Sequence, residues 1–320
     1  MPQRTAVIDI GTLKTKLIIA EFNFNNTEEL DRKILFKDNE LTLLGKNLDK
    51  NKNMLEESIK KNDRVLEKFM ALIKHHNVDA FTVVATESLR SANNSQKVVD
   101  RIYRITGKHP EILSHEDEAR IYFRTLSREI KGDITASDIG GGSIQIVTGH
   151  DNKIKNIYLL KTGIYILQQK YGEGEVLSRG KIKDEWEFIE SEIKNLNIKK
   201  NPKAKFIYGS SNIIRFLQEA GVPLSNSGLG GNFPYKAKVE DLMQLYWNII
   251  GLPMNEREKY YPSEPAFMWG ADIAIINVVT LCNAFGVEEF IPSNTSIADG
   301  LLLDLVDQKE YVHIVLGNLI

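Results

Sequence analysis

The sequence predicts a duplicated mixed α/β domain whose two halves face each other across a cleft. Two cycles along the 320-residue chain each begin with three strands joined by tight turns and continue with helices and further strands. The tripeptide Asp-Ile-Gly ends the first strand of both cycles, at Asp9 and at Asp138. Because the match reproduces the strand–turn–strand pattern as well as the tripeptide, it indicates two related domains.

The first cycle is expected to fill an N-terminal domain over residues 1–127. Runs of apolar residues predict its strands, and apolar residues at helical spacing predict an amphipathic helix at Met54–His75. Gly107 ends the next helix, and Ser114 caps the last one. The other elements are expected at Thr5–Ile10, Lys16–Phe22, Arg32–Phe36, Phe81–Ala85, Ser95–Ile105 and Glu111–Leu113.

The second cycle is expected to fill a domain over residues 128–302. A further helix at about 303–320 is expected to pack back on the first domain. A Gly-rich loop is predicted at Ser225–Tyr235. Strands are expected at Ile134–Ile139, Ser143–Gly149, Lys153–Leu160, Lys205–Tyr208 and Val287–Ile291, and helices at Tyr165–Tyr171, Lys183–Asn195, Asn212–Ala220, Val239–Ile250, Asn255–Tyr260, Phe267–Phe285 and Ala298–Val306.

Composition and charge exclude several classes of protein. With 41 Lys and Arg against 43 Asp and Glu, the net charge is -2, whereas a binder of nucleic-acid duplexes is usually basic. A small polyanion needs only a local cluster of cations. The N-terminus enters a strand without a signal-peptide core, and the most apolar segment, Ala271–Val287, is too short to span a bilayer. We therefore expect a soluble cytoplasmic protein without a nucleic-acid or membrane partner.

Three consecutive glycines follow Asp138 in the segment ASDIGGGSIQIV. A turn of Gly140, Gly141 and Gly142 lets backbone N–H groups approach an anion closely, although such a turn can also be purely structural. Asp138, at the strand end, is placed to hold Mg²⁺ through a hard oxygen ligand. The hypothesis is a phosphate-binding turn with a metal beside it.

The N-terminal hairpin repeats this arrangement in outline. Laying one hairpin on the other pairs Thr12 with Gly141, Lys14 with Ser143, and Lys16 with Gln145. The first turn therefore offers a hydroxyl and two cations where the second offers glycine and polar groups. Two such loops on opposite walls of a cleft suit a row of phosphates between them.

Five motifs along nearly the whole chain resemble the exopolyphosphatase/guanosine pentaphosphate phosphatase (Ppx/GppA) family of the actin-like and sugar-kinase superfamily. They are AVIDIGTLKTKL, ATESLRSA (Ala85–Ala92), LSHEDEAR (Leu113–Arg120), DIGGGSIQ and YGSSN (Tyr208–Asn212). The chain is similar to the short, two-domain members. The resemblance implies duplicated actin-like (ribonuclease H-like) domains, with mixed sheets flanked by helices and the active site in the interdomain cleft.

The resemblance also implies a function. Family members hydrolyse the terminal phosphoanhydride bond of polyphosphate or guanosine pentaphosphate with Mg²⁺. By position in the motifs, Glu118 is the general base, Arg90 contacts substrate, and Asp138 and Glu118 serve the metal. The implied catalytic residues are Glu118 and Gln145, and the substrate-binding residues are Thr12, Lys14, Lys16, Arg90, Gly140, Gly141, Gly142, Ser143, Gly209 and Ser210.

The residues around Glu118 support that role. Ser114 and Asp117 form a capping-box-like pair, and Glu116 and Asp117 suit the positive end of the helix dipole. Like charges beside Glu118 would raise its pKa, as a base requires. Arg120 either orients Glu118 or reaches phosphate. The alternative for Arg90 is a solvated arginine at a helix start.

Three departures from the family pattern predict weakened activity. Gln145 stands where a glutamate is usual, and an amide can neither supply negative charge nor take a proton. Thr12-Leu13-Lys14 replaces Ser-Asn-Ser, and Ala298 replaces the arginine usual near the C-terminus. Losing a general base typically costs about 10²–10⁴ in rate.

Two other functions stay open. One is a non-catalytic sensor that binds polyphosphate or guanosine tetra- or pentaphosphate, and the other is a kinase, for which the sequence shows no clear aspartate base. A homodimer is possible through an apolar interface, although burial inside the second domain would also explain those residues. They are Tyr260, Tyr261, Phe267 and Trp269.

Overall fold

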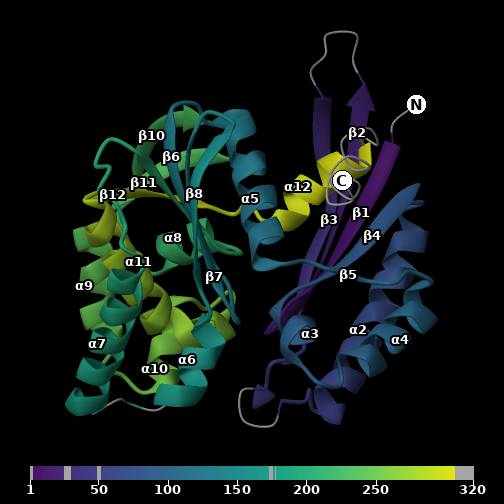
Figure 1. Cartoon of the computed structure of the whole chain (residues 1–320), viewed down its shortest axis with the longest axis horizontal. Coiled ribbons are helices and arrows are strands. Elements are labelled where there is room, and N and C mark those ends of the chain that lie inside the picture. Colours follow the sequence, from purple (N-terminus) through teal and green to yellow (C-terminus); the bar gives the residue numbers. More distant parts are fainter. Residues whose placement is uncertain (1–2, 25–29, 49–51, 173–175, 177, 307–320) are drawn as a thin grey trace. The chain divides into compact units, whose positions relative to one another are not determined.

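The structure is a computed structural model that describes residues 3–24, 30–48, 52–172, 176 and 178–306 (Figure 1). The chain forms two compact units: unit 1 comprises Met1–Ile121 and Ile297–Ile320, and unit 2 comprises Tyr122–Ser296. Each unit has its own mixed sheet flanked by helices, which confirms the predicted fold class. The boundary between the two units lies after Ile121, inside the helix that follows Ser114. The boundary expected from the sequence lies six residues later, after residue 127.

Unit 1 contains a five-stranded sheet in the order β3-β2-β1-β4-β5. Its strands are β1 Gln3–Ile10, β2 Lys14–Phe24, β3 Leu30–Leu41, β4 Ala80–Ala85 and β5 Glu111–Ile112, and its helices are α2 Glu56–His75, α3 Glu87–Ser91, α4 Ser95–Thr106, α5 His115–Glu129, which continues into unit 2, and α12 Ile297–Val306. The first three strands are antiparallel, whereas β4 and β5 run parallel to β1.

The core of unit 1 lies between the sheet and two helices. Apolar side chains of β1 and β2 pack with those of α2 and α4, and α12 packs against β1, β2 and β4. The helix expected at about 303–320 is described only to Val306, and the rest of that prediction lies outside the described residues. The short helix α3 was not expected from the sequence.

Unit 2 contains a seven-stranded sheet in the order β10-β11-β12-β9-β6-β7-β8. Its strands are β6 Asp133–Ile139, β7 Ile144–His150, β8 Lys153–Leu160, β9 Lys205–Gly209, β10 Ser225–Gly230, β11 Phe233–Lys238 and β12 Glu289–Ser293, and its helices are α6 Ile164–Tyr171, α7 Arg179–Asn195, α8 Ile213–Glu219, α9 Val239–Ile249, α10 Met254–Arg257 and α11 Ala271–Phe285, with 3₁₀ turns η1 Glu258–Tyr260 and η2 Pro265–Gly270.

A long apolar helical segment is a core element of unit 2. The segment Pro265–Phe285 is long and apolar enough to cross a membrane by length and composition, but 78% of its most apolar window is buried. It packs against α7 and α9. Of the residues considered for a homodimer interface, Tyr261 is buried against Phe267, whereas Trp269 is exposed.

The loop predicted at Ser225–Tyr235 is a β-hairpin, and that prediction was wrong. Asn226 pairs with Tyr235, and β11 joins β12. Gly228, Gly230 and Gly231 have positive φ. Gly228 lies in the irregular part of β10 between Asn226 and Gly230, and Gly231 is in the turn between the strands, so residues typical of loops here supply the bends of a hairpin. At its tip, the Asn232 side chain donates a 2.6 Å hydrogen bond to Glu129.

Candidate active site

The candidate residues of unit 1 follow the parallel ends of three adjacent strands. Ile10, Ala85 and Ile112 lie side by side at one edge of the sheet. The N–H of Thr86 donates to the Ile10 carbonyl at 3.1 Å, and that of Leu113 donates to the Ala85 carbonyl at 2.9 Å. The first hairpin turn, the segment with Arg90 and the segment with Glu118 therefore begin at the same edge, where α/β proteins commonly bind ligands.

The first hairpin turn is held by the segment that follows β3. The Gly11 N–H donates to the Lys14 carbonyl at 2.9 Å and closes the turn. The Gly45 N–H donates to the Thr12 carbonyl at 2.9 Å, and the N–H groups of Thr42 and Leu43 donate to the Leu13 carbonyl. The carbonyl groups of Thr12, Leu13 and Lys14 therefore all accept backbone hydrogen bonds from unit 1.

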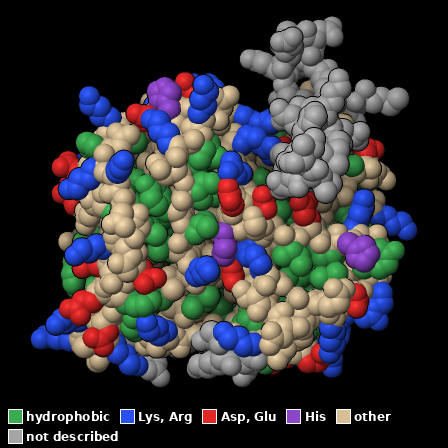
Figure 2. Space-filling view, in the orientation of Figure 1, with side chains coloured by type: hydrophobic (Ala, Val, Ile, Leu, Met, Phe, Trp, Pro, Cys, Tyr) green, Lys and Arg blue, Asp and Glu red, His purple; other side chains and the backbone are tan. Residues whose placement is uncertain are grey.

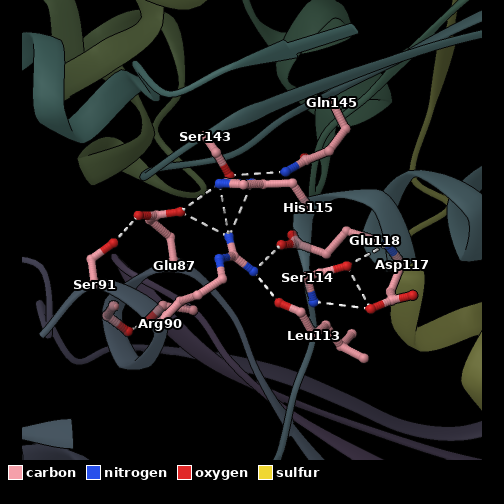
Figure 3. A network of polar contacts seen from close by, with 12 residues as sticks. Glu87, Arg90, Ser91, Leu113, Ser114, His115, Asp117, Glu118, Ser143 and Gln145 are labelled. Atoms are coloured by element: carbon pink, nitrogen blue, oxygen red, sulfur yellow. Dashed lines mark hydrogen bonds and ion pairs between the residues drawn. The ribbon is translucent and has the colours of Figure 1, made fainter. Parts of the chain in front are cut away.

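The Glu118 carboxylate is buried and forms an ion pair with Arg90. Arg90 Nη1 donates to Glu118 Oε1 at 2.8 Å, and the Glu118 side chain is 8% exposed (Figure 3). The guanidinium thus places a positive charge directly beside this buried carboxylate. The alternative of a solvated Arg90 at a helix start was wrong, because this guanidinium is mostly buried and multiply bonded.

The neighbouring acids of α5 are engaged elsewhere. Ser114 Oγ accepts from the Asp117 N–H at 3.1 Å, while Asp117 Oδ2 accepts from the Ser114 N–H at 3.1 Å, so the predicted capping box is confirmed. Glu116 pairs with Arg120 at 2.5 Å on the surface. Arg120 is therefore engaged in an exposed ion pair with Glu116.

A second carboxylate lies on the far side of the Arg90 guanidinium. Arg90 Nη2 donates to Glu87 Oε2 at 2.8 Å and lies 3.0 Å from His115 Nδ1 (Figure 3). His115 Nε2 is 3.0 Å from Glu87 Oε2, and the Ser91 hydroxyl donates to Glu87. Burial would raise the pKa of Glu87, but these hydrogen bonds outweigh it and lower the pKa to about 2.

The candidate residues of unit 2 also follow parallel strand ends. Asp138 of β6 lies opposite Gly209 of β9, and Gly209 lies opposite Ser293 of β12. The Ser210 N–H donates to the Ser293 carbonyl at 3.2 Å. A methyl group at position 209 would lie 2.0 Å from the Tyr122 hydroxyl oxygen, so glycine is needed for this close approach.

The glycine turn is bound to the N-terminus of α6. The N–H groups of Ile164 and Tyr165 donate to the carbonyls of Gly140 and Gly141 at 3.0 and 2.9 Å, and that of Gly163 donates to Gly142 at 3.1 Å. These donors are groups that a helix start leaves unpaired. Within the described chain, the amides of Gly141 and Gly142 donate no backbone hydrogen bond, so they can face an anion.

The two hairpins match position for position. Lys16 lies opposite Asp9 as Gln145 lies opposite Asp138, and Gly140 donates to the Ser143 carbonyl at 3.0 Å as Gly11 does to Lys14. This confirms the repeat. Their chemistry differs, because Lys16 Nζ lies 3.7 Å from Asp9, whereas the buried Gln145 amide donates to Ser143 Oγ at 2.9 Å (Figure 3).

Charge on the surface is mixed. On the face drawn in Figure 2, Lys and Arg side chains are interspersed with Asp and Glu. This agrees with the net charge of -2 and with anion binding by local groups rather than by a broad basic field.

The residues present fit a magnesium ion that arrives with phosphate. Within the described residues, no three His, Cys, Asp or Glu side chains are grouped as a metal site. Mg²⁺ is usually held by one or two carboxylates, with water and phosphate oxygens completing its shell. Asp138, half-buried at the strand end beside Gly209, offers one such carboxylate.

Sequence reasoning missed Glu87, Ser91 and His115. Glu87 precedes Arg90 by three positions on a helix, a spacing that brings opposite charges together. That spacing was the available signal for Glu87. The contact with His115 depends on the adjacency of β4 and β5, so no local pattern predicts it.

Fold and site together define a two-domain α/β protein with a pair of matched hairpins. The model of the Ppx/GppA phosphatase family matches residues 25–309. The chain belongs to this family.

Individual relatives agree with that assignment. A bifunctional 3-dehydroquinate synthase/phosphatase of Fusobacterium nucleatum is 29% identical over 172 residues, 52% of this chain and 26% of that protein. A guanosine-5'-triphosphate,3'-diphosphate pyrophosphatase of Pseudoalteromonas atlantica is 28% identical over 175 residues, 54% of this chain and 34% of that protein. The matches thus span about a quarter to a third of these curated relatives.

The fold is also shared with a solved structure. An exopolyphosphatase from Cytophaga hutchinsonii superposes with a TM-score of 0.82 at 20% identity, over 96% of this chain and 98% of that one. This likeness supports the duplicated actin-like architecture.

Proposed function

We propose that the protein is a Mg²⁺-dependent hydrolase of the terminal phosphoanhydride bond of inorganic polyphosphate or guanosine pentaphosphate. The observation that carries the proposal is the buried Glu118 carboxylate, held by Arg90 at the sheet edge where the first hairpin turn begins. Membership of a phosphatase family and a matched second hairpin support it.

Glu118 is the proposed general base. Its Oε1 accepts from Arg90, which fixes the carboxylate and favours its charge. Glu118 would orient a water molecule and take its proton as the water oxygen attacks the terminal phosphorus. The bond between that phosphorus and the bridging oxygen then breaks, leaving inorganic phosphate and a chain shorter by one phosphate.

The hairpin turns are the proposed phosphate sites. The amides of Gly141 and Gly142 and the hydroxyl of Ser143 would donate to phosphate oxygens, since the carbonyls of that turn are tied to α6. Thr12, Lys14 and Lys16 would act from the first hairpin, with part of the Lys16 charge offset by Asp9. We assign Gly140, Gly209 and Ser210 to the same substrate surface.

Asp138 and Glu118 are the residues that would hold Mg²⁺. When bound, the ion would neutralise phosphate charge and polarise the phosphoryl group. We also propose that the protein is cytoplasmic and that it can form a homodimer.

Gln145 supports a second candidate, a sensor that binds polyphosphate or guanosine tetra- or pentaphosphate without turnover. The Gln145 amide is occupied by Ser143 Oγ and carries no charge. Reduced turnover is therefore expected even if hydrolysis is the function. Calorimetric binding without phosphate release would favour the sensor.

Phosphate release tests the proposal. Wild-type protein is assayed with long-chain polyphosphate and with guanosine pentaphosphate, each with and without Mg²⁺. We expect magnesium-dependent release from one of them, and a loss of about 10²–10⁴ in kcat for Glu118→Gln. Glu116→Gln, an exposed change in the same helix turn, is the matched control. Equal rates for Glu118→Gln and wild type would exclude Glu118 as the base.

A further inference from the structure

We propose that Glu87 and His115 are positioning residues that act on Glu118 through Arg90. This inference rests on the proposed function, because it concerns how the proposed base is held. It also changes the role of Arg90, from a contact with substrate phosphate to the group that fixes the carboxylate.

Both terminal nitrogens of Arg90 are engaged with protein groups. Nη1 donates to Glu118 Oε1 and to the Leu113 carbonyl, and Nη2 donates to Glu87 Oε2 and faces His115 Nδ1 (Figure 3). The remaining donor, Nε, is buried and has no hydrogen-bond partner among the described residues. A phosphate could bind the terminal N–H groups only by displacing one of these acceptors.

His115 contacts both Arg90 and Glu87. Its Nδ1 and Nε2 lie 3.0 and 3.5 Å from Arg90 Nη2. Its Nε2 also lies 3.0 Å from Glu87 Oε2. The side chains of Glu87, His115 and Arg90 thus all contact one another, and each restricts the position of the other two.

Charge balance points to a geometric role for Glu87. Arg90 alone is enough to neutralise Glu118, so a second carboxylate on the same guanidinium adds no needed charge. Glu87 instead accepts a hydrogen bond from Nη2, the terminal nitrogen that does not contact Glu118. With both edges bonded, the guanidinium cannot swing, and Nη1 stays aimed at Glu118.

Kinetic constants of four variants test the proposal. Glu87→Leu removes the acceptor and the charge, Glu87→Gln keeps an acceptor oxygen, and Glu116→Gln is the control. We expect Glu87→Leu to lower kcat about 10- to 100-fold with KM changed less than about twofold, because a misplaced base slows the reaction without weakening binding. Glu87→Gln should recover most of that loss, and His115→Ala should behave like Glu87→Leu.

A double variant separates positioning from general damage. If Glu87 acts through Glu118, Glu87→Leu has no further effect on kcat in the Glu118→Gln background, whereas independent effects would multiply. Multiplying effects would overturn the proposal. A lower KM for Glu87→Gln would also overturn it, because that result would mean that Glu87 competes with substrate phosphate for Arg90.

Binding keeps this inference distinct from the proposed function. Calorimetry with tripolyphosphate needs no turnover. If wild type releases no phosphate from any substrate, the proposed hydrolysis fails, while unchanged tripolyphosphate affinity in Arg90→Leu still supports a positioning Arg90. An affinity loss of about tenfold or more in Arg90→Leu would show a phosphate contact and overturn the inference.

Discussion

Gln145 lies directly opposite Asp138 in the β6–β7 pair, at the strand end where the glycine turn begins. Its side chain is 2% exposed, and its amide nitrogen donates to Ser143 Oγ. An uncharged group therefore occupies the position opposite the proposed metal carboxylate.

Gln145→Glu should raise magnesium-dependent phosphate release. The change replaces an amide of the same shape with a carboxylate, and the Ser143 hydroxyl can reverse its hydrogen bond and donate to it. We expect a gain of about tenfold or more in kcat, a modest part of what a general base contributes. The measurement is the initial rate with polyphosphate, and Gln145→Leu is the control for shape. A rate equal to or below wild type would show that Gln145 is not the residue that limits turnover.

Gly163→Ala should disturb the glycine turn. A methyl group there would lie 2.4 Å from the Gly141 carbonyl, so the start of α6 must move away from the turn that it binds. We expect a loss of about 1–3 kcal/mol in stability and weaker binding of tripolyphosphate. Gly251→Ala is the matched control, because no heavy atom of the described residues, other than those of the glycine and its chain neighbours, lies within 4 Å of its added methyl. Urea unfolding and calorimetry measure the two effects, and wild-type values for Gly163→Ala would contradict this view of the turn.

The sequence predicted the repeat because a hairpin is local. Asp-Ile-Gly, the alternation of its strands and the three glycines all lie within a dozen residues, and the register followed from aligning them. The capping box at Ser114 was predictable for the same reason. What failed was the Ser225–Tyr235 hairpin, since Gly and Ser give no apolar alternation.

Contacts that depend on sheet order were out of reach. Arg90 and Glu118 are 28 positions apart, and their ion pair exists because β4 and β5 are neighbours. Likewise, the hydrogen bonds between the glycine turn and the start of α6 form only because β8 runs antiparallel to β7 and brings the chain back to the turn. The types of the site residues were therefore predictable, but their bonding was not.

Asp272→Asn should destabilise unit 2 strongly. Arg257 and Asp272 form a buried ion pair at 2.8 Å, and Arg257 also donates to the carbonyls of Leu252 and Ile250. Removing the carboxylate leaves a buried guanidinium charge without its counter-ion, which typically costs about 3–5 kcal/mol. Glu187→Gln, which breaks the exposed pair with Lys183, should change stability by less than about 0.5 kcal/mol. If Asp272→Asn and Glu187→Gln both lower the stability by a similarly small amount, the buried ion pair is not needed for the stability of unit 2.

Glu185 of α7 should make the stability of the protein depend on pH. Its side chain is fully buried, both carboxylate oxygens have no hydrogen-bond partner among the described residues, and burial raises its pKa to about 8, with the Asp272 charge adding to the shift and Arg257 opposing it. Because the folded-state pKa lies above the ordinary value of 4.5, the folded protein binds a proton that the unfolded chain releases between these values. The stability is therefore fully present below about pH 4.5 and is lost as pH rises to about 8, at no more than about 1.4 kcal/mol per pH unit.

Glu185→Gln should remove this dependence, because the amide stays neutral at every pH. Chemical unfolding across pH 5–9 should show that the variant becomes progressively more stable than wild type as pH rises, with the largest difference at or above pH 8. Glu190→Gln, an exposed change on the same helix, serves as the control and should follow the wild-type curve. Parallel curves for Glu185→Gln and wild type would mean that water or a nearby donor reaches the Glu185 carboxylate and lets it ionise at no cost. The difference between the two curves thus measures how completely water is excluded from the contact between α7 and α11.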